Sequence, residues 1–197
     1  AMRLILQSEQ SGTNRELLEQ LFRVEQYVEM VLQYLRSENM SSDLMIKRYS
    51  LDHIVRQAIR KYSKSFIYKK IKLNYKSLNC QVLTDEKWLT FVIEQILSNA
   101  LKYTNKGEIS IYMDDELSDT LVIEDTGIGI EPEDLPRVFE KGFTGYTGRM
   151  DKKSTGIGLY LCKRILSKLS HTINIESTPG KGTKVKIGFP AADIAAD

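Results

Sequence analysis

Patterns typical of helices and of strands alternate along most of this chain, and this alternation restricts the fold more than any other feature. Amphipathic helical spacing is found in residues 51–64, 85–104 and 156–169. Short segments with strand-like alternation or apolar runs lie between and after them, at residues 70–76, 81–84, 109–113, 121–123, 172–176 and 183–189. Strands and helices mixed in this order predict an α+β fold, with a mixed β-sheet and helices packed on one face.

The first part of the chain has a different pattern. Thr13 and Glu16 have the spacing of a helix capping box. Apolar residues then recur at the heptad spacing of helices that pack at a shallow angle: Leu17, Leu21, Val24, Val28, Val31 and Leu35. Residues 1–9 are predicted to end a preceding antiparallel helix. Because two short helices form a poor core alone, we expect two copies to form a four-helix bundle; the alternative is a helix packed on its own domain.

These patterns divide the chain into three parts. Residues 1–42 are predicted to form the helical hairpin, and residues 43–190 the α+β domain. Residues 191–197 form a tail with no recognisable role, either a frayed end or a cloning remnant.

Composition excludes several classes of protein. The chain carries 28 basic and 26 acidic side chains, and this near balance argues against a nucleic-acid partner. There is no signal peptide and no apolar run of the ~20 residues that a membrane span requires, so we expect the chain itself to be soluble. Cys80 and Cys162 lack metal-binding spacing and are expected to be core residues in a reducing compartment.

One polar stripe follows the predicted helix at residues 86–104. Gln95, Asn99, Lys102 and Tyr103 project from one side of it, apart from the apolar face. An amide oxygen, an ammonium and an aromatic ring together suit a Mg²⁺-triphosphate, because Mg²⁺ prefers oxygen ligands and is usually held by one or two protein groups plus phosphates. The alternative is an ordinary solvated helix face.

Glycine motifs follow in two places. In the stretch EDTGIGI, Asp125 can accept a hydrogen bond from an exocyclic amine, and Gly127 and Gly129 permit positive φ and close backbone approach. Further on, Gly156 and Gly158 open a helix whose N-terminal amides can hold an anion. Each motif alone is a weak signal.

A glycine-rich segment lies between these two motifs. It contains Phe139 and Phe143 and then the basic residues Arg149, Lys152 and Lys153. A mobile, basic loop that leads into a phosphate site is typical of an ATP lid. The alternative is a solvated charged loop.

The order of these segments is far more specific than any one of them. With the closing G-x-G-T at Gly180–Thr183, residues 45–190 resemble the ATP-binding domain of bacterial sensor histidine kinases, with its N, G1, F, G2 and G3 boxes. The heptad helix resembles the second helix of that family's dimerisation and phosphotransfer hairpin. The run STGIGLYLCKRI and the short lid are also similar to the bacitracin-sensing type, which is partnered with peptide-antibiotic transporters.

The resemblance implies a role for each matching residue. Asn99 holds Mg²⁺, assisted by Gln95, while Lys102 contacts phosphate and Tyr103 lines the nucleotide. Asp125 reads the adenine amine with support from Thr183. The other residues expected around ATP form the backbone walls and the lid: Gly127, Gly129, Ile130, Phe139, Phe143, Arg149, Lys153, Thr155, Gly156, Gly158 and Leu159.

The implied function is a kinase core. It transfers the γ-phosphoryl of Mg²⁺-ATP to a histidine, and from there to an aspartate of a response regulator. The resemblance further implies a homodimer and the cytoplasmic part of a membrane-anchored bacterial protein. The acceptor histidine is missing, because His53 and His171 both lie outside the heptad segment. We therefore expect this fragment to bind ATP without phosphorylating itself.

Two other functions remain open on the sequence. One is an ATP-gated conformational ATPase of the gyrase, chaperone or mismatch-repair kind. Those enzymes carry a water-activating Glu at the position of Gln95, which cannot act as a base, and Glu94 points about 100° away around the helix. The other is a nucleotide-binding dimer module that has lost catalysis.

Overall fold

The computed structural model describes residues 44–117, 119–145, 155–190 and 194–196, together with isolated positions between residues 17 and 35. The chain divides into two compact units, Ala1–Ser42 and Asp43–Asp197. In the first unit the described positions are helical, as the heptad pattern predicts. The predicted preceding helix lies outside the described residues.

The second unit is built on a five-stranded sheet with the order β2-β4-β5-β7-β6. Strand β2 pairs with β4 in parallel, whereas the other neighbours are antiparallel, so the sheet is mixed as predicted. The strands are β2 (Lys72–Tyr75), β4 (Glu108–Met113), β5 (Thr120–Asp125), β7 (Gly182–Gly188) and β6 (Thr172–Thr178).

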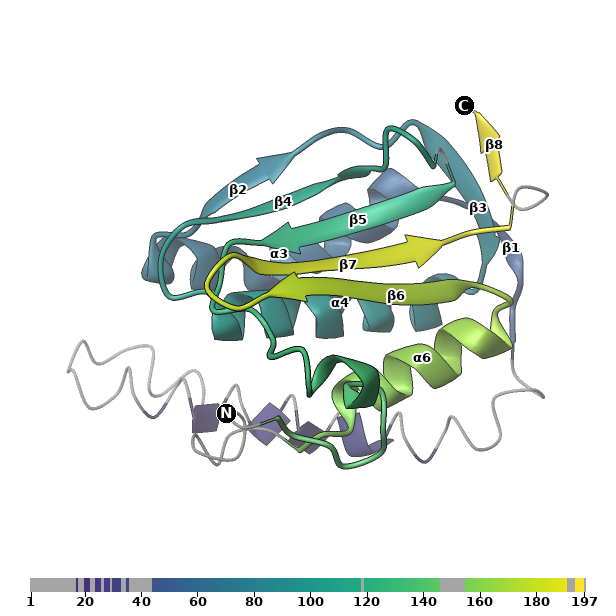
Figure 1. Ribbon diagram of the computed structural model, residues 1–197. Helices are drawn as coiled ribbons and strands as arrows, with labels where there is room; N and C mark the ends of the chain where they lie inside the picture. Colours follow the sequence, from purple (N-terminus) through teal and green to yellow (C-terminus); the bar gives the residue numbers. More distant parts are fainter. Residues whose placement is uncertain are drawn as a thin grey trace. The chain divides into compact units, whose positions relative to one another are not determined.

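Three helices cover one face of this sheet (Figure 1). They are α3 (Leu51–Lys69), α4 (Glu86–Tyr103) and α6 (Gly158–Lys168). Asp85 caps the start of α4, since its side chain accepts a hydrogen bond of 3.1 Å from the amide of Trp88. Helix α3 continues one turn beyond its predicted end, and a 3₁₀ turn, η2 (Leu135–Arg137), lies in the segment predicted to be irregular.

A second, smaller sheet has the order β1-β3-β8. Its strands are β1 (Lys47–Ser50), β3 (Cys80–Thr84) and β8 (Ile194–Ala196), all antiparallel. The sequence predicted only β3. The interpretation of residues 191–197 as a tail without a role is therefore wrong for residues 194–196, which add an edge strand to β3 through backbone pairing.

The two faces of the large sheet differ in chemistry. Successive side chains of a strand point to opposite faces, so Leu121, Ile123 and Asp125 share the helix-covered face. Across it, the rows pair apolar residues: Ile111 with Ile123, and Ile123 with Val185. Both isoleucines are almost completely buried. In the last row of this face, Ile109 is apolar, but Asp125 and its neighbours Thr183 and Ser177 on β7 and β6 are polar, and the functional candidates gather at that end.

Candidate functional site

Asp125 is the last residue of β5 and is buried, with 7% of its surface exposed. Its Oδ1 accepts hydrogen bonds from the amide of Gly127 (2.8 Å) and from the hydroxyl of Thr104 (3.4 Å). Burial raises the pKa of Asp125, and the hydrogen bonds from Gly127 and Thr104 only partly oppose this rise. The site therefore begins with a carboxylate that is withdrawn from water.

A row of polar side chains crosses the sheet from Asp125. Thr183 of β7 lies opposite Asp125, and Ser177 of β6 lies opposite Thr183. A hydrogen bond from the backbone amide of Thr183 lowers the pKa of Asp125. The hydroxyl of Thr183 lies 3.0 Å from the hydroxyl of Ser177. Ser177 also donates to the carbonyl of Gly182 (2.7 Å) and accepts from the amide of Ile130 (2.9 Å). Ser177 thus ties the loop after β5 to the turn between β6 and β7.

The two glycines of EDTGIGI serve different needs. A Cβ on Gly127 would lie 2.5 Å from the carbonyl oxygen of Tyr103 and 2.7 Å from Asp125 Oδ1, so a side chain has no room there. Gly129 has φ +74°, in the region that favours glycine, and a Cβ there would lie 2.2 Å from the carbonyl oxygen of Thr178. The predicted positive φ is found at Gly129, and the predicted close approach at both.

The end of α4 reaches the same loop. The carbonyl of Tyr103 accepts a hydrogen bond from the amide of Ile128 (3.2 Å). Asn99, Lys102 and Tyr103 are all half-buried on the last turns of α4, and the ammonium of Lys102 lies 4.9 Å from the centre of the Tyr103 ring. The polar stripe of α4 therefore leads directly to Asp125.

Gln95 and Glu94 point to different neighbours, as their spacing predicts. A Cβ on Gly158 would lie 3.1 Å from Gln95 Oε1, so the amide of Gln95 faces the first residue of α6. Glu94 instead forms an ion pair with Lys61 of α3. The carboxylate next to Gln95 is thus engaged by another helix.

The start of α6 can hold an anion. Gly156 has φ +66°, and its carbonyl accepts from the amide of Gly142 (2.9 Å). The N-cap residue is Ile157, whose side chain offers no acceptor to the first amides of the helix. Thr155 and Leu159, both half-buried, flank this turn. This backbone is compatible with the predicted phosphate site, which stays a prediction; α6 begins at Gly158 rather than at the predicted Gly156.

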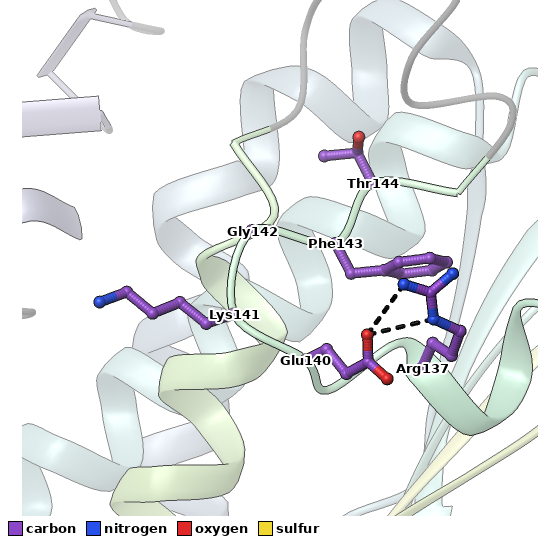
Figure 2. Close-up of a pocket in the computed structure, with 6 residues that line it drawn as sticks. All are labelled: Arg137, Glu140, Lys141, Gly142, Phe143 and Thr144. Carbon is purple, nitrogen blue, oxygen red and sulfur yellow. Dashed lines mark hydrogen bonds and ion pairs between the residues drawn. The ribbon is translucent and has the colours of Figure 1, made fainter.

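The described part of the predicted lid contains a pocket of about 220 Å³ (Figure 2). Figure 2 shows Arg137 next to Glu140 and Phe143; its guanidinium lies 3.1 Å from Glu140 Oε2 and 4.4 Å from the Phe143 ring centre. Phe139 lies 5.2 Å from the ammonium of Lys163 on α6. The residues that line the pocket all belong to the predicted lid segment, and they include neither Asp125 nor Asn99. Arg149 and Lys153 lie outside the described residues.

The donor set fits a magnesium nucleotide. Among the described residues there is no group of three or more His, Cys, Asp or Glu side chains that could hold a metal ion alone. A cation beside Asn99 would therefore take most of its ligands from phosphate and water, which is the usual arrangement for Mg²⁺. The buried carboxylate, the glycine backbone and the start of α6 supply partners for a base and for phosphates.

Three residues of this site were missed by the sequence analysis. Thr104 and Ser177 orient Asp125 and its loop, and Gly182 leaves room for β5, since a Cβ there would lie 1.9 Å from the carbonyl oxygen of Asp125. Gly182 stood within the quoted G-x-G-T motif, which was a usable signal. Thr104 and Ser177 carry no comparable signal in their local sequence.

Comparison with known proteins identifies the family. The family of “Histidine kinase-, DNA gyrase B-, and HSP90-like ATPase” domains matches residues 84–193. The chain belongs to this ATPase family. That match covers α4, the glycine motifs and the closing strands, which are the elements that build the site.

Curated relatives of this chain are sensor kinases. Sensor histidine kinase YxdK of Bacillus subtilis is 34% identical over 94% of this chain, and sensor protein BceS of Halalkalibacterium halodurans is 36% identical over 96%. Sensor histidine kinase GraS of Staphylococcus haemolyticus is also 36% identical over 96%. The chain spans 56–58% of the length of these relatives. The resemblance to bacterial sensor histidine kinases is confirmed.

Solved structures show the same fold for this chain. Full-length ShkA, crystallised in complex with AMPPNP, matches 100% of this chain with 42% of its own, with a TM-score of 0.70 and 19% identity. Acinetobacter baumannii histidine kinase AdeS matches 96% of this chain with 95% of its own, with a TM-score of 0.63 and 22% identity. Within the described residues, no helix is long and apolar enough to span a bilayer.

Proposed function

We propose that this chain is the kinase core of a sensor histidine kinase, which binds Mg²⁺-ATP and transfers its γ-phosphoryl group to a histidine. The observation that carries the proposal is Asp125, a carboxylate buried at the end of β5 with a raised pKa, next to a loop of glycine backbone. Such a group accepts a hydrogen bond from the exocyclic amine of adenine, and a guanine base presents an oxygen in its place. The ATP-binding core follows from family membership; the residue roles are our proposal.

The remaining groups are assigned by their positions. Tyr103 lines the nucleotide, and Lys102 beside it contacts phosphate as a point charge. Gly156, Gly158 and the first amides of α6 hold phosphate oxygens. From the sequence, Arg149 and Lys153 are proposed to close over the phosphates with the lid.

Mg²⁺ is assigned to Asn99. When bound, the ion neutralises charge that develops on the transferred phosphoryl group. The Gln95 amide faces the start of α6, the proposed phosphate side, which supports its assisting role. This chain's own contribution is to bind, orient and enclose the nucleotide.

Gln95 and Glu94 favour transfer to a side chain over hydrolysis by water. Gln95 cannot remove a proton from water, and Glu94 is paired with Lys61 on the α3 side. In the proposed step, an imidazole nitrogen forms a bond to the γ-phosphorus while the bond from that phosphorus to the β,γ-bridging oxygen breaks. ADP leaves, and the imidazole proton passes to an acidic neighbour of the acceptor histidine.

The acceptor is proposed to be neither histidine of this sequence. His171 is buried, with Nε2 3.1 Å from the Thr84 hydroxyl and its ring against Phe189. His53 lies on the first turn of α3, 3.8 Å from Glu86. We therefore propose that the parent protein supplies the acceptor from its phosphotransfer hairpin, and that this fragment does not phosphorylate itself.

The heptad helix is proposed to join two copies of the parent protein. Leu17, Val24, Val28 and Leu35 are 46–58% exposed in the single chain, so an apolar seam remains to be covered. The onward partner is proposed to be the receiver domain of a response regulator. The resemblance to the bacitracin-sensing type suggests a peptide-antibiotic transporter as a further partner of the parent protein.

The binding site is tested by substituting Asn99. Asn99→Ala is expected to abolish the part of AMPPNP affinity that depends on Mg²⁺, measured by titration calorimetry with and without the ion. Asn105→Ala, which changes an exposed asparagine just beyond α4, serves as the control. Equal Mg²⁺-dependent affinity for Asn99→Ala and the parent chain would refute the assignment.

The reaction is tested with a longer chain. Restoring about 20–30 upstream residues, most of a hairpin helix at 1.5 Å rise per residue, supplies the proposed acceptor. With labelled ATP, we expect acid-labile and base-stable label on one histidine. Steady hydrolysis of ATP without labelled protein would instead support a conformational ATPase of the gyrase or chaperone kind.

A further inference from the structure

Helices α3 and α4 run side by side in the same direction. His53 Nε2 lies 3.8 Å from Glu86 Oε1 near their starts, and Lys61 pairs with Glu94 in the middle. At their ends, the ammonium of Lys69 donates to the carbonyl of Leu101 and to the carbonyl of Thr104 (3.1 Å). Because both helices end together, their C-termini place partial negative charge on the same side.

Lys69 is the last residue of α3, yet its ammonium binds backbone carbonyls at the end of α4. The last carbonyls of a helix have no partner within the helix, and Lys69 satisfies one of them together with the carbonyl of the C-cap residue Thr104. This position has a cost, because burial lowers the pKa of the Lys69 ammonium. A lysine that only solubilised α3 would extend into water.

The turn that Lys69 holds is in direct contact with Asp125. The hydroxyl of Thr104, whose carbonyl Lys69 binds, donates to Asp125 Oδ1. Thr104 is completely buried. One residue earlier, the carbonyl of Tyr103 accepts a hydrogen bond from the amide of Ile128 (3.2 Å), and a Cβ on Gly127 would lie only 2.5 Å from that carbonyl oxygen, so this turn packs closely against the loop after Asp125. A displacement at the end of α4 therefore moves the hydroxyl that orients the carboxylate.

We propose that Lys69 is a positioning residue for the nucleotide base: its ammonium fixes the end of α4 so that Thr104 orients Asp125 toward the amine of adenine. Lys69 does not touch the base itself. The inference rests on the proposed role of Asp125. It adds a specificity determinant on α3, which precedes all of the glycine motifs and the polar stripe of α4 in the sequence.

The test uses the full 197-residue chain. Titration calorimetry compares AMPPNP with its guanine counterpart, GMPPNP, for the parent chain and for Lys69→Met. We expect AMPPNP affinity to fall by about three- to tenfold and the adenine preference to fall with it. Lys69→Arg, which keeps a cation at the same site, is expected to retain most of the preference. Lys61→Met removes the mid-helix pair of the same two helices and is expected to leave the preference unchanged.

Two further variants separate positioning from general stability. Thr104→Val removes only the buried hydroxyl, and it is expected to reproduce the loss of preference even if Lys69→Met folds poorly. Lys69→Met and Asp125→Asn are expected to be less than additive in AMPPNP binding, because both act on one hydrogen-bonded unit. A lower melting temperature for Lys69→Met with an unchanged adenine preference would overturn the proposal.

Failure of this inference and failure of the proposed function give different results. If Asp125→Asn lowers the adenine preference but Lys69→Met and Thr104→Val do not, only the role of Lys69 is wrong. If Asp125→Asn leaves the preference unchanged, the assignment of Asp125 fails and the role of Lys69 fails with it.

Discussion

Two aspartates of this domain are rich in hydrogen bonds, yet their pKa values move in opposite directions. Asp52, in the first turn of α3, accepts from Tyr75, from Ser77 (3.2 Å), from the amide of Leu78 (3.0 Å) and from Arg56 (2.5 Å). Burial raises its pKa, but the hydrogen bonds from Tyr75, Leu78 and Arg56 outweigh this and lower it to about 2. For Asp125 burial prevails, and the pKa is raised.

The difference supports a structural role for Asp52 and the proposed binding role of Asp125. The fold itself supplies Asp52 with a cation and donors that fasten the β2–β3 connection onto α3. Asp125 is more deeply buried, and its charged neighbour Glu124 raises its pKa further. A buried carboxylate with a raised pKa next to glycine backbone is typical of a functional site, where the ligand completes the set of hydrogen bonds.

The largest expected effect of this difference is on binding. Asp125→Asn should weaken AMPPNP binding by about 10- to 100-fold, because a hydrogen bond to a charged group is lost. The same variant should be at least as resistant to heat as the parent chain, since a neutral amide is less costly to bury than a carboxylate. Calorimetry and thermal unfolding measure the two quantities. A clear fall in melting temperature with intact binding would reverse the roles of the two aspartates.

Asp52→Asn should give the opposite result. We expect the free energy of unfolding to fall by about 2 kcal/mol, because the charge-assisted bonds from Arg56 and Tyr75 are weakened. AMPPNP affinity should not change, since Asp52 lies outside the site. Urea unfolding followed by circular dichroism measures the free energy of unfolding, and calorimetry measures the AMPPNP affinity. Asp115→Asn, at an exposed aspartate in the β4–β5 turn, is the control.

Acid should reduce the contribution of Asp52. Its pKa is about 2 in the folded chain and about 3.8 when unperturbed, so its stabilisation is present above pH 3.8 and is lost as the pH falls toward 2. The stability difference between the parent chain and Asp52→Asn should therefore shrink by roughly 1 kcal/mol over this range, allowing for solvent screening. A constant difference from pH 5 to pH 2 would show that the charge of Asp52 is unimportant.

The sequence predicts most of the large sheet and its helices, because those elements carry periodic apolar patterns. It does not predict β1 and β8, which are short and depend on pairing with β3. Nor does it predict that β2 pairs with β4 in parallel, since register is decided by contacts between strands.

The residues of the candidate site also fall into two groups, those that the sequence predicts and those that only the structure shows. Asp125 and Gly127 are recognisable because an acid and glycines stand together in the sequence. Thr104, Ser177 and Lys69 are not, because each acts on a partner 21 to 47 residues away. Local motifs can therefore mark where a ligand binds, whereas the groups that hold the motif in place emerge only from packing.

The smallest expected effect is on the helix-free face of the sheet. There Lys186 lies 2.7 Å from Glu176 and 3.7 Å from Asp114, and both pairs are partly open to water. Lys186→Met should lower the melting temperature by less than Asp52→Asn does, because exposed ion pairs contribute little and are screened by salt. The difference in melting temperature between Lys186→Met and the parent chain should disappear in 1 M NaCl, and the AMPPNP affinity of the two should be the same. A loss of affinity in Lys186→Met would mean that charges on the open face also act on the nucleotide, and the contrast between Asp52 and Asp125 would then be too simple.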